Sequence, residues 1–134
     1  MVENNLYMTG LQKFTLEFPI KASPKVLFTL VGTGEGLARW FADKVSVKED
    51  LYLFQWEGSE QSAKLLERKE SEFILFEWAD DFHQGYNLEI RITHEPVSGE
   101  SALIITDYAE ASDVEFTERW WNNQVGRLQR LFNS

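Results

Sequence analysis

The chain has 134 residues, of which 43% are hydrophobic and 26% are charged, as is usual for a globular domain with one core. Its 13 basic and 22 acidic residues give a net charge of −9, which argues against binding to the nucleic-acid backbone or to anionic membranes. Because cysteine is absent, disulfides, thiolate metal sites and cysteine nucleophiles are excluded.

The first ten residues are polar and acidic and lack the apolar segment of a signal peptide. We expect residues 1–10 to be a loosely ordered segment of a single domain that spans residues 1–134. The longest apolar runs, such as residues 73–76, are far shorter than the roughly 20 residues of a membrane span. A cytoplasmic protein is therefore the default expectation.

The first predicted strand lies between Phe14 and Ile20, where apolar residues occupy every second position. Ser23 follows as a suitable N-cap, and Pro24 suits the first position of a helix because it lacks the N–H group that would remain unpaired there. The sequence therefore predicts a strand that leads directly into a short helix.

Three closely spaced glycines, Gly32, Gly34 and Gly36, interrupt this helix before a second short helix that carries Trp40 and Phe41 inward. One interpretation makes Trp40 and Phe41 a movable lid hinged at Gly34 and Gly36. The favoured interpretation is that they pack the second helix against the sheet.

The middle of the chain is typical of an antiparallel sheet. Turn residues separate six strand-like runs, near residues 45–47, 51–56, 61–68, 72–78, 87–94 and 102–108. Leu88, Ile90 and Ile92 alternate with polar residues, which indicates one buried face and one face in water.

A final helix of about twenty residues is predicted after Asp113, its expected N-cap, because apolar residues recur there at helical spacing. This helix must cover the apolar face of the sheet, since no other element remains to do so. Glu110, Glu115 and Glu118 favour the positive end of the helix dipole. An acidic patch that faces a partner is the less favoured alternative.

Five segments give the sequence a family resemblance: residues 20–28 (IKASP, then Val26 and Phe28), 36–41 (GLARWF), 54–56 (FQW), 76–78 (FEW), and Trp120–Trp121 with Leu128 and Leu131. In these segments the chain resembles the activator-of-Hsp90-ATPase-like branch of the START-like, or helix-grip, superfamily. The resemblance extends over residues 13–132. It implies an α+β fold in which a curved antiparallel sheet of about six or seven strands, in the order β-α-α-β(n)-α, wraps around a long C-terminal helix.

The resemblance also implies a cleft between the sheet and the last helix. In many superfamily members this cleft holds a hydrophobic or aromatic small molecule, whereas other members bind proteins. Small bacterial members commonly have no assigned function. The family has no universal catalytic motif, so the resemblance assigns no catalytic residue, metal or cofactor.

Seven aromatic residues are expected to line this cleft: Trp40, Tyr52, Phe54, Trp56, Phe76, Trp78 and Trp121. Rings with a polar group, such as those of Tyr52 and Trp78, suit a flat or lipidic ligand. The alternative is that these side chains simply fill the core, as a domain of this size requires.

Polar candidates are weaker. His83 lies near acidic residues and His94 stands beside another, but neither has a second histidine at ligand spacing, so we expect solvated loop residues. Glu67, Asp107 and Tyr108 are the candidates for a polar group inside the cleft, and positions at an edge or on the outer face are the simpler interpretation. The common hydrolase, NTPase and dehydrogenase motifs are absent.

The leading hypothesis is a non-enzymatic protein that binds a hydrophobic or aromatic small molecule in this cleft. The first alternative is a protein-interaction module, similar to a chaperone accessory, with a filled core and a protein partner. The second is an enzyme of the cyclase or hydrolase type, which would need a polar cluster buried in the cleft. Nucleic acids and membranes are not expected partners.

Overall fold

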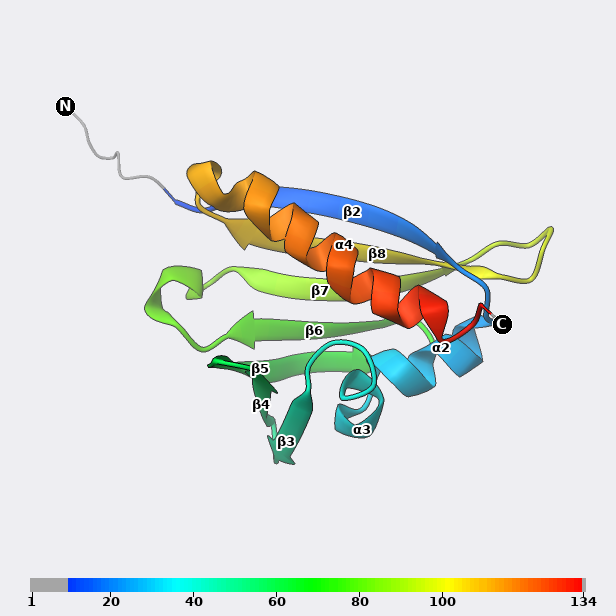
Figure 1. The fold of residues 1–134 in the computed structure, drawn as a ribbon, viewed down its shortest axis with the longest axis horizontal. Coiled ribbons are helices and arrows are strands. Elements are labelled where there is room, and N and C mark those ends of the chain that lie inside the picture. The colour runs from blue at the N-terminus through cyan, green and yellow to red at the C-terminus, as the bar shows by residue number, and fades with distance from the viewer. Residues whose placement is uncertain (1–9, 134) are drawn as a thin grey trace.

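A seven-stranded antiparallel sheet curves around one long helix, α4 (Val114–Arg130), in the computed structural model, which describes residues 10–133 (Figure 1). Almost all of the segment expected to be loosely ordered therefore lies outside the described residues. The strands are β2 (Gln12–Ile20), β3 (Lys44–Lys48), β4 (Leu51–Trp56), β5 (Ser59–Lys69), β6 (Phe73–Trp78), β7 (Asn87–His94) and β8 (Ser101–Ala109). Their spatial order is β2-β8-β7-β6-β5-β4-β3. The predicted helix-grip class is confirmed.

One face of the sheet forms the core together with α4, as the alternation of apolar residues predicts. On β6 and β7, every second side chain is buried, including Phe76 and Ile90. On α4, Trp121, Val125 and Leu128 recur at helical spacing and are fully buried. The strands that come first and last along the chain, β2 and β8, pair with each other, so the sheet is continuous beneath the helix (Figure 1).

The two predicted helix caps have different outcomes. Ser23 caps α2 (Pro24–Val31), and its hydroxyl accepts a hydrogen bond of 3.3 Å from the N–H of Val26. Asp113 precedes α4 as predicted, but its side chain makes no capping hydrogen bond. It ends a short 3₁₀ helix, η2 (Ala111–Asp113), and its backbone is already close to helical, whereas a capping side chain needs an extended backbone.

The second short helix ends earlier than predicted. Helix α3 (Gly34–Leu37) stops before Trp40 and Phe41, which lie in the turn that follows. Both rings are only 1% exposed, and the Trp40 indole N–H donates a hydrogen bond of 2.8 Å to the carbonyl oxygen of Leu30. The interpretation that Trp40 and Phe41 pack inside the fold is therefore confirmed, and the alternative of a movable lid is not supported.

Candidate ligand pocket

Phe41 fills the middle of the cleft between the sheet and α4. Its ring centroid lies 4.9 Å from that of Phe54, 5.3 Å from that of Trp121 and 5.5 Å from that of Trp120. Its carbonyl oxygen also accepts hydrogen bonds from the side chains of Trp56 and Gln124. Phe41, only 1% exposed, thereby joins the turn after α3 to the sheet and to the helix.

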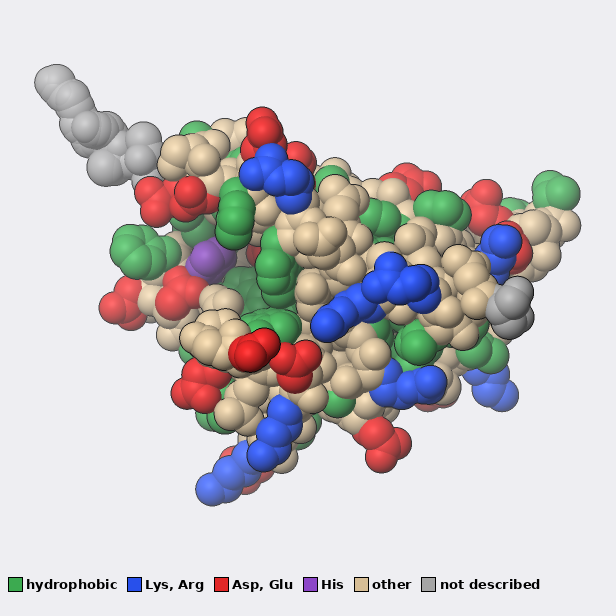
Figure 2. All heavy atoms as spheres, in the orientation of Figure 1, with side chains coloured by type: hydrophobic (Ala, Val, Ile, Leu, Met, Phe, Trp, Pro, Cys, Tyr) green, Lys and Arg blue, Asp and Glu red, His purple; other side chains and the backbone are tan. Residues whose placement is uncertain are grey.

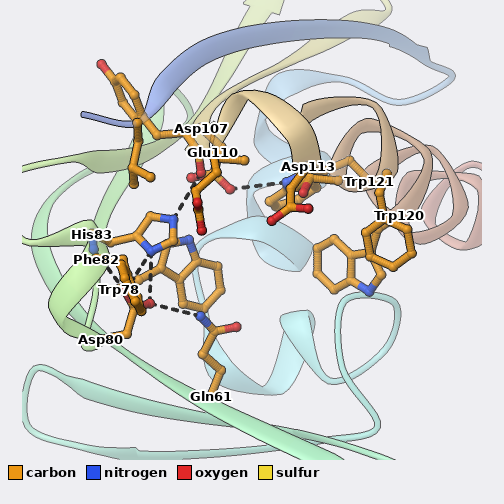
Figure 3. Close-up of a pocket in the computed structure, with 15 residues that line it drawn as sticks. Gln61, Trp78, Asp80, Phe82, His83, Asp107, Glu110, Asp113, Trp120 and Trp121 are labelled. Atoms are coloured by element: carbon orange, nitrogen blue, oxygen red, sulfur yellow. Dashed lines mark hydrogen bonds and ion pairs between the residues drawn. The ribbon is translucent and has the colours of Figure 1, made fainter. Parts of the chain in front are cut away.

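An open pocket of about 340 Å³ remains at one end of the cleft (Figure 3). It lies where β6 and β8 end, between the short helix η1 (Asp81–His83) and the start of α4. Its aromatic lining comprises Trp78, Phe82, Tyr108, Phe116, Trp120 and Trp121, and its polar lining includes Gln61, Asp80, His83, Asp107, Glu110 and Asp113. Figure 2 shows hydrophobic side chains around this hollow and acidic side chains on its rim.

The floor and the rim of the pocket differ in exposure. Trp121 and Asp107, at 0% and 4% exposed, belong to the floor. Phe82 and Phe116 are 73% and 65% exposed and stand at the rim. The pocket therefore combines a buried floor containing one carboxyl group with a water-facing aromatic rim.

Asp107 is inside the fold, so its predicted position at an edge or on the outer face is wrong. It shares the inward face of β8 with Leu103 and Ile105, because alternate residues of a strand point to the same side. The Trp121 indole N–H donates a 3.3 Å hydrogen bond to Asp107 Oδ2, whereas Oδ1 is buried and has no hydrogen-bond partner within the described residues. Burial raises the pKa of Asp107 to about 6, although the Tyr108 N–H and the Trp121 indole lower it in part.

The other two polar candidates agree with the simpler interpretation. Glu67 is exposed. Tyr108 is among the residues that line the pocket, but its ring lies on the face of β8 opposite to Asp107, where it packs at a tilt against the ring of Tyr86 with 5.0 Å between the centroids.

Asp80 and His83 form a second polar group at the pocket wall (Figure 3). His83 Nδ1 lies 2.8 Å from Asp80 Oδ1, and His83 Nε2 lies 3.0 Å from the carbonyl oxygen of Tyr108. Both ring nitrogens thus lie within hydrogen-bonding distance of oxygen atoms of the protein. Burial by itself would raise the pKa of Asp80, but the hydrogen bonds and charge of His83, with a contact from Gln61, lower it.

The prediction of a solvated loop position is wrong for His83 and confirmed for His94. His83 is half-buried because it connects η1 to the end of β8, a long-range contact that its sequence neighbours do not reveal. His94 is exposed at the end of β7.

The structure separates the seven aromatic residues expected to line the cleft. Trp78 and Trp121 lie at the pocket. The remaining five lie outside its lining: Trp40, Tyr52, Phe54 and Phe76 are buried in the core, and Trp56 is partly buried, with its indole N–H bonded to Phe41. The core-filling alternative thus describes most of the set, and ligand contact stays a prediction for Trp78 and Trp121.

Three aromatic residues of the pocket were not among the expected ones: Phe82, Phe116 and Trp120. Phe116 and Trp120 are four residues apart on α4, so helical spacing alone places them on one side of the helix. Phe82 lies in the loop between β6 and β7 and gives no comparable signal in the sequence.

A curved antiparallel sheet around one long C-terminal helix, α4, is the arrangement that defines the helix-grip class of domains. A family profile described as START-like superfamily domain matches residues 8–134. The chain therefore belongs to the START-like superfamily. No curated protein matches the chain.

Three solved structures illustrate the similarity. The solution structure of BfR322 from Bacteroides fragilis is 28% identical, with 92% of each chain covered and a TM-score of 0.62. An uncharacterised protein from Bacillus thuringiensis is 14% identical over 92% of this chain and 100% of that chain, with a TM-score of 0.78. The Aha1 dimer from Colwellia psychrerythraea is 15% identical, with 90% and 92% covered and a TM-score of 0.72. The last two similarities show the fold alone.

Two further findings concern residues 10–133. No helix in this part of the chain is long and apolar enough to span a membrane. In the same range, no three His, Asp or Glu side chains are grouped so that they could hold a metal ion.

Proposed function

We propose that the protein binds, without transforming it, a small molecule with an apolar aromatic body in the pocket between the end of the sheet and the start of α4. The observation that carries this proposal is a hollow of about 340 Å³ whose lining includes three tryptophan and two phenylalanine side chains. Its volume lies at the lower end of the range for small-molecule sites, roughly 300–1,000 Å³.

The exposure of the rim supports binding. Phe82 and Phe116 hold large apolar surfaces in water at the pocket, one from η1 and one from α4. A ligand between them would remove part of that surface from water, and each Å² of apolar surface removed contributes about 25 cal/mol. Ring faces also give a flat ligand favourable stacking geometry.

The polar groups favour binding over catalysis. Both ring nitrogens of His83 already contact oxygen atoms of the protein, so both of its hydrogen-bonding positions are engaged within the fold. Asp107 Oδ1 is covered, and Oδ2 accepts from Trp121. These contacts are those of groups that shape a pocket.

The protein-interaction alternative is favoured by one observation, the exposure of Phe82 and Phe116 at the same end of the molecule. Exposed aromatic residues are common at protein interfaces. The two functions differ in what they require, because a small molecule needs the space inside the pocket and a protein partner needs only the outer rim.

A pocket-filling substitution tests the proposal. Thr117 lines the pocket from the first turns of α4, so Thr117→Trp should occupy the space without removing a core side chain. Binding of the neutral dye N-phenyl-1-naphthylamine, followed by its fluorescence, should weaken at least about tenfold, equivalent to 1.4 kcal/mol.

The matched control is Ser46→Trp, which adds the same side chain to an exposed position of the edge strand β3, outside the lining of this pocket. It should leave dye binding unchanged. If dye binds equally to wild type and Thr117→Trp, or to neither, the small-molecule proposal is wrong.

A further inference from the structure

The charges that line the pocket are mostly negative. Four carboxylates, those of Asp80, Asp107, Glu110 and Asp113, contribute to the lining, and no lysine or arginine is among the described residues that do so. His83 is the single basic side chain of this lining, and it is bonded to Asp80. Among the described residues, the other three carboxylates form no ion pair, although the charge of His83 lowers the pKa of Asp107 in part.

Asp107 distinguishes this arrangement from a surface cluster of acidic residues. It is 96% covered, given its 4% exposure, and it lies on the pocket floor with Oδ1 unpaired. A buried carboxylate with one unpaired oxygen is unfavourable, because the charge has lost its water and regained only part of that stabilisation from the Trp121 indole. A cation in the pocket would stabilise the charge of Asp107 by electrostatic attraction, which is stronger where little water screens it. Because Oδ1 is covered, this attraction would act without direct contact to that atom.

The aromatic rings face the same space as the carboxylates. Figure 3 shows Trp120 and Trp121 on one side of the pocket, with Asp107, Glu110 and Asp113 near the top and Trp78 below them. The negative faces of tryptophan rings attract ammonium groups, most strongly where water is excluded. Carboxylates and indole rings thus favour the same kind of ligand group.

From these observations we infer that the ligand of this pocket is an organic cation, a protonated amine or a quaternary ammonium group attached to the apolar aromatic body. This inference rests on the proposed function and specifies its ligand class. The aromatic lining receives the body, and the carboxylate side of the pocket receives the cationic group.

Three probes share a naphthalene body and differ in the charge of the head group: the cation 2-(naphthalen-2-yl)ethylammonium, the neutral 2-(naphthalen-2-yl)ethanol and the anion 2-(naphthalen-2-yl)acetate. Their affinities for the wild-type protein are compared by isothermal titration calorimetry at pH 7.5. The amine should bind about tenfold more tightly than the alcohol, in line with a cation held by rings and carboxylates, and the acetate should bind most weakly.

Variants locate the effect. Asp107→Asn keeps the shape and the acceptor for the Trp121 indole while removing the charge, so the amine-to-alcohol preference should fall to less than about threefold. Asp50→Asn makes the same chemical change in the turn between β3 and β4, outside the pocket, and should leave the preference unchanged. The double variant Glu110→Gln with Asp113→Asn changes two exposed residues and should also reduce the preference for the amine. It replaces Asp107→Asn as the test if that variant does not fold.

Each outcome is decisive. Equal binding of the amine and the alcohol to wild type would overturn the cationic ligand class and leave the proposed aromatic binding intact. Binding of none of the three would contradict the proposed function as well. A preference that survives both Asp107→Asn and the rim double variant would show that the carboxylates of this pocket do not recognise the cation.

Discussion

Asp107 is held in a position that favours its neutral form. Burial raises its pKa from 3.8 to about 6, so between these values the folded protein binds more protons than the unfolded chain. Folding stability contributed by this group is therefore highest below pH 4 and falls as the pH rises to about 6. The full difference corresponds to roughly 3 kcal/mol, at 1.36 kcal/mol for each pKa unit.

Asp107→Asn tests this assignment, because the amide cannot ionise. Relative to wild type, the variant should gain up to about 3 kcal/mol of unfolding free energy as the pH rises from 4 to 7.5. Urea unfolding across that range measures the difference, and the comparison removes the common contribution of other groups, including Asp80 with its lowered pKa. A difference that does not change with pH would contradict the raised pKa.

Single residues also show where sequence reasoning stops. Asp107 was within reach of prediction, since it continues the inward alternation of Leu103 and Ile105 on one strand. His83 was not, because its position depends on the carbonyl oxygen of Tyr108, 25 residues away. Periodicity describes a face of one element and gives no information on which loop will meet that face.

At the scale of elements, the contact between α2 and α3 depends on a missing side chain. A Cβ atom at Gly36 would lie 2.1 Å from the carbonyl oxygen of Thr29 and 2.6 Å from Cα of Leu30. Both are backbone atoms of α2, so they cannot move aside as the end of a flexible side chain can. Gly36 is thus required for close packing of the two helices.

Gly36→Ala should therefore destabilise the fold by roughly 1–3 kcal/mol through this overlap. The matched control is Gly126→Ala in the middle of α4, where the new Cβ would lie an ordinary 3.6 Å from Arg130. That variant should be more stable by about 0.5–1 kcal/mol, since alanine favours a helix over glycine. Thermal unfolding of both proteins checks the prediction, and equal effects of the two substitutions would contradict it.

The elements themselves were largely predictable, and their ends were less so. Alternating apolar residues and the turn residues between strand-like runs are local properties, and together they located all seven strands of the sheet and the inward face of β7. The end of α3 was misplaced because the inward direction of Trp40 and Phe41 suggested continued helix. A tight turn buries the same two rings, and sequence pattern does not distinguish these two backbones.

At the scale of the whole molecule, the pocket exists because Phe41 fills only part of the cleft. Its ring contacts Trp121 and Phe54 in the middle, and the space beyond it, beside Phe116 and Phe82, stays open. The sequence and the family resemblance predicted a cleft with aromatic walls. They did not predict which side chains fill it, because that depends on the packing of three separated segments.

The most direct test of ligand binding at this pocket uses the tryptophan side chains as reporters. Each of the five tryptophans has one indole N–H group, which gives one signal in a ¹H–¹⁵N NMR spectrum. Trp78, Trp120 and Trp121 line the pocket, whereas Trp40 and Trp56 lie outside its lining.

We expect the indole signals of the three pocket tryptophans to shift when 2-(naphthalen-2-yl)ethanol, a neutral probe, is added. The indole signal of Trp40 should stay in place. Its indole N–H is held by the carbonyl oxygen of Leu30 in the core. Shifts of equal size at Trp40 and at the pocket tryptophans, or no shift at any of them, would contradict binding at the end of the cleft.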